Sequence, residues 1–183
     1  MPRYREVPRY IDMPAVLTAC PNPDWRNMAT AIYYTGARSG EMIQVKVKDV
    51  NQDEHNPDFL NITLPTEKNR TQVSRIVPIS ITQEPEGAAL FADLARARPP
   101  EELLFNWGDQ PTTLLRKMRY NFNHYYAGVA PHYFRHCRLT HLVIKFGYGS
   151  HELKQYAGWS DERPARVYVH LRVEDLQNKM VGK

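Results

Sequence analysis

The chain has 183 residues, of which 42% are hydrophobic and 24% are charged, a composition typical of a folded globular domain and not of a disordered chain. No apolar run approaches the roughly 20 residues of a membrane-spanning helix, and the N-terminus lacks the apolar stretch of a signal peptide, so we expect a cytoplasmic protein without a membrane partner. The net charge of +4 is too small to identify a partner by itself.

The first part of the chain is predicted to form three short helices, over 13–20, 25–35 and 39–44. Asp12 and Asp24 are the candidate N-caps of the first two helices, because a short polar side chain can accept hydrogen bonds from the first turn. Gly36 is the candidate residue that ends the second helix. Arg38 therefore lies in a tight corner between two helices.

The next stretch has the pattern of a small sheet. Runs rich in β-branched and aromatic residues occur at 47–50, 59–64 and 73–79, with turn residues between them. This spacing predicts a three-stranded antiparallel sheet. Lys68 falls in the connection between the second and third strands.

The rest of the chain returns to helical periodicity. Helices are predicted from Pro85 to about residue 97 and over 111–126, 131–146 and 150–157, and the tail is predicted to form another helix. Gly158 and Trp159 follow the helix over 150–157, and Pro164 opens a segment that contains Tyr168. We therefore expect a single domain of the α+β class, mainly α, with one small antiparallel sheet.

One segment of the chain is strongly basic. Residues 110–151 contain no Asp or Glu but six Lys or Arg and five of the seven His. Such a segment can receive a polyanion, although a solvated helix face would have the same composition. The two cysteines, Cys20 and Cys137, lie far apart and match no metal-ligand spacing, so we expect neither a disulfide framework nor a zinc site.

The basic segment also carries candidate catalytic groups. His132 and Arg135 lie three residues apart near a helix N-terminus, a position that attracts a phosphate. Because the segment has no carboxylate, a magnesium cage would have to come from elsewhere, which favours a metal-free reaction. Taken singly, each candidate also has a structural explanation. Arg38 could interact with a helix dipole, and Tyr168 could be a packing residue.

Taken together and in order, these residues resemble the catalytic domain of the tyrosine recombinases, the phage integrase family. The resemblance extends from about Ile11 to the end of the chain. Its motifs are the arginine box at 35–41, a hairpin lysine at Lys68, the His-x-x-Arg box at 132–135, Gly158-Trp159 where most members have Gly-His, and a nucleophile segment at 164–171 with Tyr168 followed by His170. Complete members also have an N-terminal helical domain, which these residues do not supply, so we expect 1–183 to be the catalytic domain alone.

The resemblance implies a site-specific recombinase that cuts and rejoins double-stranded DNA through a 3'-phosphotyrosyl link, without metal, ATP or cofactor. Tyr168 would be the nucleophile, and Arg38 and Arg135 would stabilise the charge on phosphorus. His132 would assist proton transfer, Trp159 would donate its indole N–H, and Lys68 would protonate the leaving 5'-oxygen.

The same resemblance implies partner protomers in a tetrameric synapse on DNA. Three alternatives stay open from the residues: a type IB topoisomerase, a DNA-binding module without catalysis, and a metal-dependent nuclease. The acid-free segment disfavours the nuclease, and the full set of candidate active residues disfavours the binding module.

Overall fold

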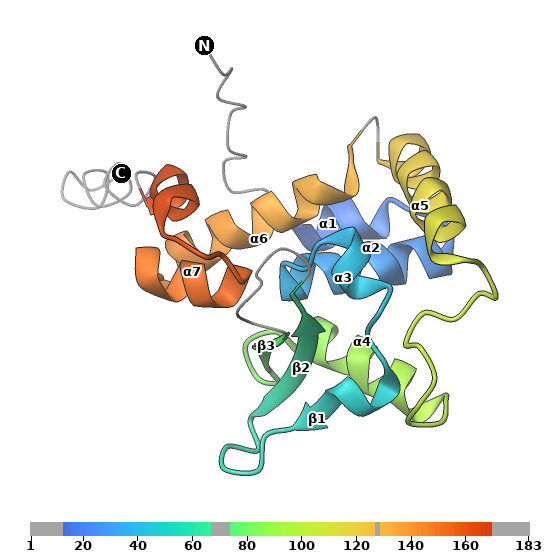
Figure 1. Cartoon of the computed structure of the whole chain (residues 1–183), viewed down its shortest axis with the longest axis horizontal. Coiled ribbons are helices and arrows are strands. Elements are labelled where there is room, and N and C mark those ends of the chain that lie inside the picture. The colour runs from blue at the N-terminus through green and yellow to red at the C-terminus, as the bar shows by residue number, and fades with distance from the viewer. Residues whose placement is uncertain (1–12, 67–73, 127–128, 170–183) are drawn as a thin grey trace.

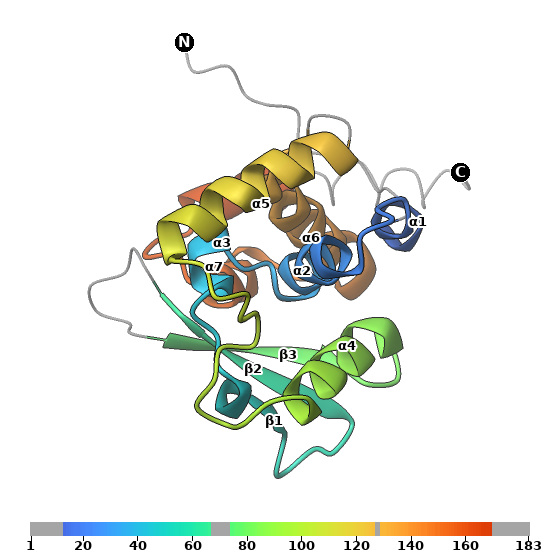
Figure 2. The same cartoon turned by 90° about the vertical axis from the view of Figure 1, so that its right-hand side faces the viewer.

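A computed structural model describes residues 13–66, 74–126 and 129–169 (Figure 1). The helices are α1 (Met13–Thr18), α2 (Pro23–Thr35), α3 (Ser39–Met42), α4 (Pro85–Arg96), α5 (Pro111–Tyr125), α6 (Pro131–Phe146) and α7 (Ser150–Ala157), and the strands are β1 (Val50–Gln52), β2 (Phe59–Pro65) and β3 (Ser74–Ser80). Figure 2 shows α4 and the sheet below a layer made by the other helices. The predicted class, mainly α with one small sheet, is confirmed.

The sheet is antiparallel with strand order β1-β2-β3, as predicted. Ile62 in the central strand pairs with Val50 on one side and with Val77 on the other. Side chains alternate along β2, so that Leu60, Ile62 and Leu64 are buried in the core. The sheet is thereby fixed to the helical layer, with β3 alongside α7.

The predicted strand over 47–50 is wrong for most of its length. Val47–Asp49 form a short 3-10 helix, and β1 begins only at Val50. The Asp49 carboxylate accepts a hydrogen bond from the Lys46 N–H at 2.8 Å, which closes this turn. Val47 and Lys48 donate their N–H groups to carbonyls of the chain after α4, so these groups are engaged outside the sheet.

Helix α2 lies at the centre of the core and packs against α1, α4, α5 and α6. Its cap is Asn22 and not the predicted Asp24, because Pro23 occupies the first helical position and shifts the start of the helix. The Asn22 side chain accepts a hydrogen bond from the Trp25 N–H at 3.2 Å. The predicted end is confirmed, since Gly36 adopts a left-handed conformation with φ of 59°.

A buried ion pair fixes α6 in the core. The Arg138 guanidinium donates hydrogen bonds to both carboxylate oxygens of Glu84, and both residues are buried. Its Nε donates to the Tyr156 hydroxyl at 2.9 Å. This pair holds α6 against the turn before α4.

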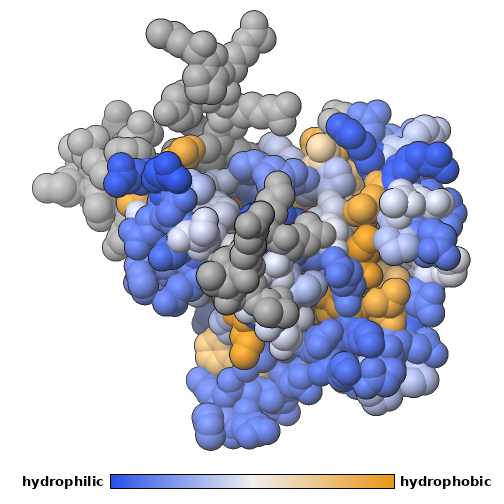
Figure 3. Space-filling view, viewed as in Figure 1, coloured by the Kyte–Doolittle hydropathy of each residue, from blue (hydrophilic) through white to orange (hydrophobic). Residues whose placement is uncertain are grey.

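The face of the molecule seen in Figure 1 is mostly polar. Figure 3 shows hydrophilic residues over most of the face seen in Figure 1, with apolar residues in small patches. In the three described ranges, no helix combines the length and the apolar character needed to cross a bilayer. Cys20 and Cys137 are both free and buried.

Candidate active site

The predicted site residues lie at the ends of several helices. Arg38 is the N-cap of α3, Arg135 lies in α6, and Trp159 follows the glycine that ends α7. Tyr168 lies in a helical turn over 166–169. The structure brings these four residues together, and Lys68 lies outside the described residues.

Glu41 gathers three arginines around one buried carboxylate. Its oxygens accept hydrogen bonds from Arg38 Nη1 at 2.6 Å and from Arg75 Nη2 at 2.8 Å, and Arg135 Nη1 lies 3.9 Å away. Burial raises the pKa of Glu41, but the hydrogen bond and charge of Arg75 and the contacts of Arg38 and Arg135 hold it below its usual value. Glu41 is therefore a carboxylate that positions cations.

Arg135 joins the ends of two helices that are far apart in the chain. It donates hydrogen bonds to the carbonyl of Gly36, which ends α2, and at 2.8 Å to the carbonyl of Ala157, which ends α7. Burial and the charges of Arg38 and Arg75 lower the pKa of Arg135 to about 9, so the guanidinium stays charged at neutral pH. Arg135 thus holds a positive charge at the centre of the site.

The candidate nucleophile lies against this arginine through an aromatic stack. Arg135 Cζ lies 5.7 Å from the centre of the Trp159 ring, and the Trp159 ring stacks on the Tyr168 ring with 6.1 Å between centroids. Tyr168 is only 3% exposed. Burial raises the pKa of Tyr168 to about 12, although the charge of Arg135 lowers it. The phenol is therefore neutral at physiological pH.

The two histidines of the second motif have different positions. His136 Nδ1 is hydrogen-bonded to the Tyr168 hydroxyl, and the two rings stack with 5.9 Å between centroids. His132 lies one helical turn earlier and is exposed. Its ring meets the His136 ring edge-on at 4.5 Å. The predicted histidine is therefore adjacent to the site, and the next histidine contacts the candidate nucleophile.

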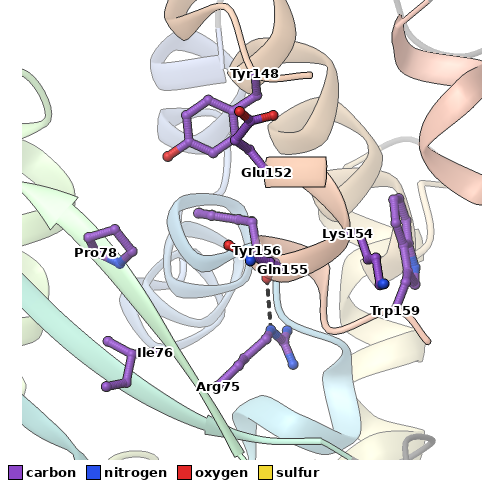
Figure 4. Close-up of a pocket in the computed structure, with 9 residues that line it drawn as sticks. All are labelled: Arg75, Ile76, Pro78, Tyr148, Glu152, Lys154, Gln155, Tyr156 and Trp159. Atoms are coloured by element: carbon purple, nitrogen blue, oxygen red, sulfur yellow. Dashed lines mark hydrogen bonds between the residues drawn. The ribbon is translucent and has the colours of Figure 1, made fainter. Parts of the chain in front are cut away.

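A groove of about 650 Å³ runs beside the site between β3 and α7 (Figure 4). Ile76 and Pro78 line it on the strand side, and Lys154 and Trp159 line it on the helix side. At its base, Arg75 Nε donates a hydrogen bond to the Tyr156 carbonyl at 2.8 Å. Arg75 thereby ties the base of the β2–β3 connection to α7.

Position 158 requires glycine because Arg75 packs closely against its backbone. Gly158 has φ of 66°, and a Cβ at this position would lie 3.0 Å from both Cδ and Nη1 of Arg75. A side chain here would therefore combine backbone strain with a close contact. This requirement explains why glycine precedes Trp159.

Three residues of the site were not among the sequence-predicted set: Glu41, Arg75 and His136. Each left a signal in the sequence. Glu41 stands three residues after Arg38, in the capping-box position. Arg75 alternates with Val77 and Ile79 along its strand, so it lies on the same buried face and is expected to point into the core. His136 follows His132 by four residues and so shares its helix face.

Within the ranges that the structure describes, no three His, Cys, Asp or Glu side chains gather in a way that could hold a metal ion. The cations that converge are instead Arg38, Arg75 and Arg135. Such a set can neutralise an anion and stabilise negative charge that develops on it.

Comparison with known proteins identifies relatives of this fold. The model of the phage integrase family matches residues 11–175. The tyrosine recombinase XerA of Saccharolobus solfataricus is 26% identical over 169 residues, which are 92% of this chain and 53% of that protein. The chain thus spans about half the length of this curated relative.

Solved structures show the same fold. The catalytic domain of bacteriophage HP1 integrase has a TM-score of 0.63 at 22% identity, covering 93% of this chain and 92% of that one. The XerH site-specific recombinase bound to its difH substrate, in a pre-cleavage complex, has a TM-score of 0.62 at 20% identity, covering 93% of this chain and 53% of that one.

Proposed function

The chain belongs to the phage integrase family, and from this membership we propose that it supplies the catalytic domain of a site-specific tyrosine recombinase. In this reaction the chain cuts and rejoins DNA strands through a 3'-phosphotyrosyl intermediate, without metal or ATP. The observation that carries the proposal is the stack of Arg135, Trp159 and Tyr168, which puts a neutral phenol beside a buried cation.

Tyr168 is the nucleophile of this reaction. Its hydroxyl oxygen attacks a backbone phosphorus, the new P–O bond forms, and the bond from phosphorus to the 5'-oxygen breaks. The liberated 5'-hydroxyl, or that of a partner strand, later attacks the phosphotyrosyl link and releases Tyr168. One phosphodiester is exchanged for another, so no external energy source is required.

The arginines stabilise the negative charge on the phosphoryl oxygens. Arg38 is the more accessible, with a side chain 18% exposed, while Arg135 is almost fully buried. Glu41 orients Arg38 through a hydrogen bond, and the carbonyls of Gly36 and Ala157 orient Arg135, so both guanidinium groups are held in place before the substrate arrives. Trp159 adds an indole N–H donor, and this donor cannot carry a proton away.

Two further roles belong to the proposal. Lys68, outside the described residues, protonates the leaving 5'-oxygen. His132, exposed near the N-terminus of α6, assists from the solvent side of the site.

Double-stranded DNA is the proposed partner, in a synapse of four protomers. The exposed Arg116 and Arg119 line a hollow of about 440 Å³ on α5, within the segment that has no acidic residue. Cations spread over such a face bind the phosphate backbone by releasing its counterions. We propose that it acts on DNA in the cytoplasm.

A nicked suicide substrate tests the proposal, because loss of a short strand traps the covalent complex. The wild type should form a protein–DNA adduct in the presence of EDTA, and Tyr168→Phe should form none while it still binds DNA. Tyr125→Phe, at the end of α5, is the matched control and should form the adduct. An adduct that persists in Tyr168→Phe would assign another nucleophile, and loss of activity in EDTA would favour the nuclease alternative.

A further inference from the structure

The hydroxyl of Tyr168 has a specific partner. Tyr168 and His136 come from different elements, separated by 32 residues in the chain, yet the His136 Nδ1 atom and the phenol oxygen form a hydrogen bond. Their rings also stack at an interplanar angle of 23°. The hydrogen bond and the ring stacking together fix the position of the phenol oxygen relative to the imidazole.

A neutral phenol needs a proton acceptor when it attacks phosphorus. Burial raises the pKa of Tyr168 to about 12, and Arg135 offsets this only in part. The thiol of Cys137, on the same helix as His136, raises the pKa of Tyr168 as well and so does not favour the phenolate. An imidazole is the side chain best suited to take a proton near neutral pH.

The position of His136 matches this task. It follows Arg135 directly in α6, so the helix that carries the central cation also carries the group that contacts the nucleophile. His136 is half-buried, between the exposed His132 and the buried Tyr168. The His132 ring also meets the His136 ring edge-on, with 4.5 Å between ring centroids.

On the basis of the proposed function, we propose that His136 is a further catalytic residue, which takes the phenol proton as Tyr168 attacks. The Tyr168 oxygen forms a bond to phosphorus, its proton passes to His136 Nδ1, and the bond to the 5'-oxygen breaks with its electron pair. The 5'-oxygen is protonated by Lys68. In the rejoining step the same proton returns from His136 to the Tyr168 oxygen as it leaves.

This role requires a particular form of the imidazole. Nδ1 must be the unprotonated nitrogen before attack, so Nε2 carries the hydrogen in the neutral ring. After attack the ring is an imidazolium close to the phosphate, where its charge is compensated by the DNA. His136 therefore passes between neutral and charged forms once in each cleavage.

The test varies the acidity of the nucleophile. Position 168 is filled with either tyrosine or a difluorotyrosine, whose phenol is more acidic, by nonsense suppression in the full chain. For each form, the rate of covalent attachment to the nicked substrate is measured in a single turnover, with and without His136→Asn. Asparagine keeps an acceptor near the position of Nδ1 but cannot take a proton at neutral pH.

With tyrosine at position 168, His136→Asn should slow attachment by about 10²-fold or more, as expected for loss of a general base. With difluorotyrosine the loss should shrink by about tenfold or more, because a more acidic phenol depends less on an acceptor. DNA affinity should be unchanged in both forms. His136→Gln serves if the asparagine variant unfolds, as judged by its thermal transition.

An equal loss with both phenols would overturn the role of His136, since a residue that only shapes the site is indifferent to phenol acidity. His132→Asn is the matched control. If difluorotyrosine reduces the loss of rate in His132→Asn but not in His136→Asn, the proton acceptor is His132. If the chain with wild-type residues forms no adduct, the proposed function fails and this inference fails with it. If the wild type forms the adduct but the loss of rate in His136→Asn does not depend on the acidity of the phenol, only this inference is rejected.

Discussion

Removal of the Glu41 carboxylate tests whether one buried acid organises the arginines. Glu41 is fully buried and Arg75, its closest buried partner, has a side chain only 2% exposed. Glu41→Ala leaves the Arg75 charge in the core without a carboxylate partner among the described residues, although its hydrogen bond to the Tyr156 carbonyl remains. Breaking a buried pair in this way lowers the free energy of unfolding by about 3–5 kcal/mol.

The contacts support this magnitude. A hydrogen bond to a charged group contributes about 1.5–3 kcal/mol, and Glu41 accepts one from Arg75 and another from the partly exposed Arg38. For a chain of this length, each kcal/mol shifts the melting temperature by about 2–4 °C, so Glu41→Ala should melt about 6–20 °C below the wild type. Urea unfolding, followed by circular dichroism, measures the free energy directly.

The pH dependence has a definite sign. The pKa of Glu41 is lower in the folded chain than the 4.5 of the free group, so its stabilisation is complete above pH 4.5 and is lost as pH falls through the folded pKa. As the pH falls below 4.5, the free energy of unfolding should therefore decrease less in Glu41→Ala than in the wild type.

A surface pair provides the control. Glu101 is exposed and contacts Lys46 and Lys48, so Glu101→Ala should melt close to the wild type. The reasoning is refuted if Glu41→Ala destabilises the chain no more than Glu101→Ala does. It is also refuted if Arg75→Met has the same effect in the wild type as in Glu41→Ala, because coupled partners are not additive.

Two other substitutions probe the site. Arg38→Ala should slow covalent attachment by about 10²-fold or more, because it removes one donor from a preorganised anion site, and DNA affinity should fall less. If the rate of attachment and the DNA affinity fall by the same factor, Arg38 only binds the DNA backbone. Gly158→Ala should destabilise the chain more than Gly108→Ala, by thermal melting. Both glycines have positive φ, but a Cβ at Gly108 meets nothing within 4 Å whereas one at Gly158 meets Arg75. Equal melting temperatures would remove Arg75 from the explanation.

Local signals in the sequence account for the helices that were predicted well. Pro131 and Gly147 mark the two ends of α6 because proline fits a first turn and glycine fits a left-handed C-cap. The short 3-10 helix at 47–49 was missed because Val47 and Val50, at the two ends of the predicted strand, have strand propensity. The hydrogen bonds that override this propensity go to the carbonyls of residues 100 and 102. Long-range contacts of this kind leave no trace in local pattern.

The residues of the candidate site likewise differ in whether a local sequence pattern predicts them. Arg38, Arg135, Trp159 and Tyr168 belong to motifs with recognisable spacing, and the structure gathers all four. The contact between Tyr168 and His136 depends on how the segment after α7 returns to α6, which no local pattern specifies. The sequence therefore predicts the motif residues, whereas the residues that contact and orient them, Glu41, Arg75 and His136, come from the structure.

The hydrogen bonds of Arg135 have a consequence for the order in which the molecule folds. Its guanidinium meets the carbonyl of Gly36, which is 99 residues away in the chain, and that of Ala157, which is 22 residues away. Contacts between distant residues form late, because the intervening chain must lose its freedom first. A growing chain on the ribosome can build α2 and the sheet early, but it cannot join the ends of α2 and α7 until α7 has emerged. The candidate active site is thus completed only after α2 and α7 have come together.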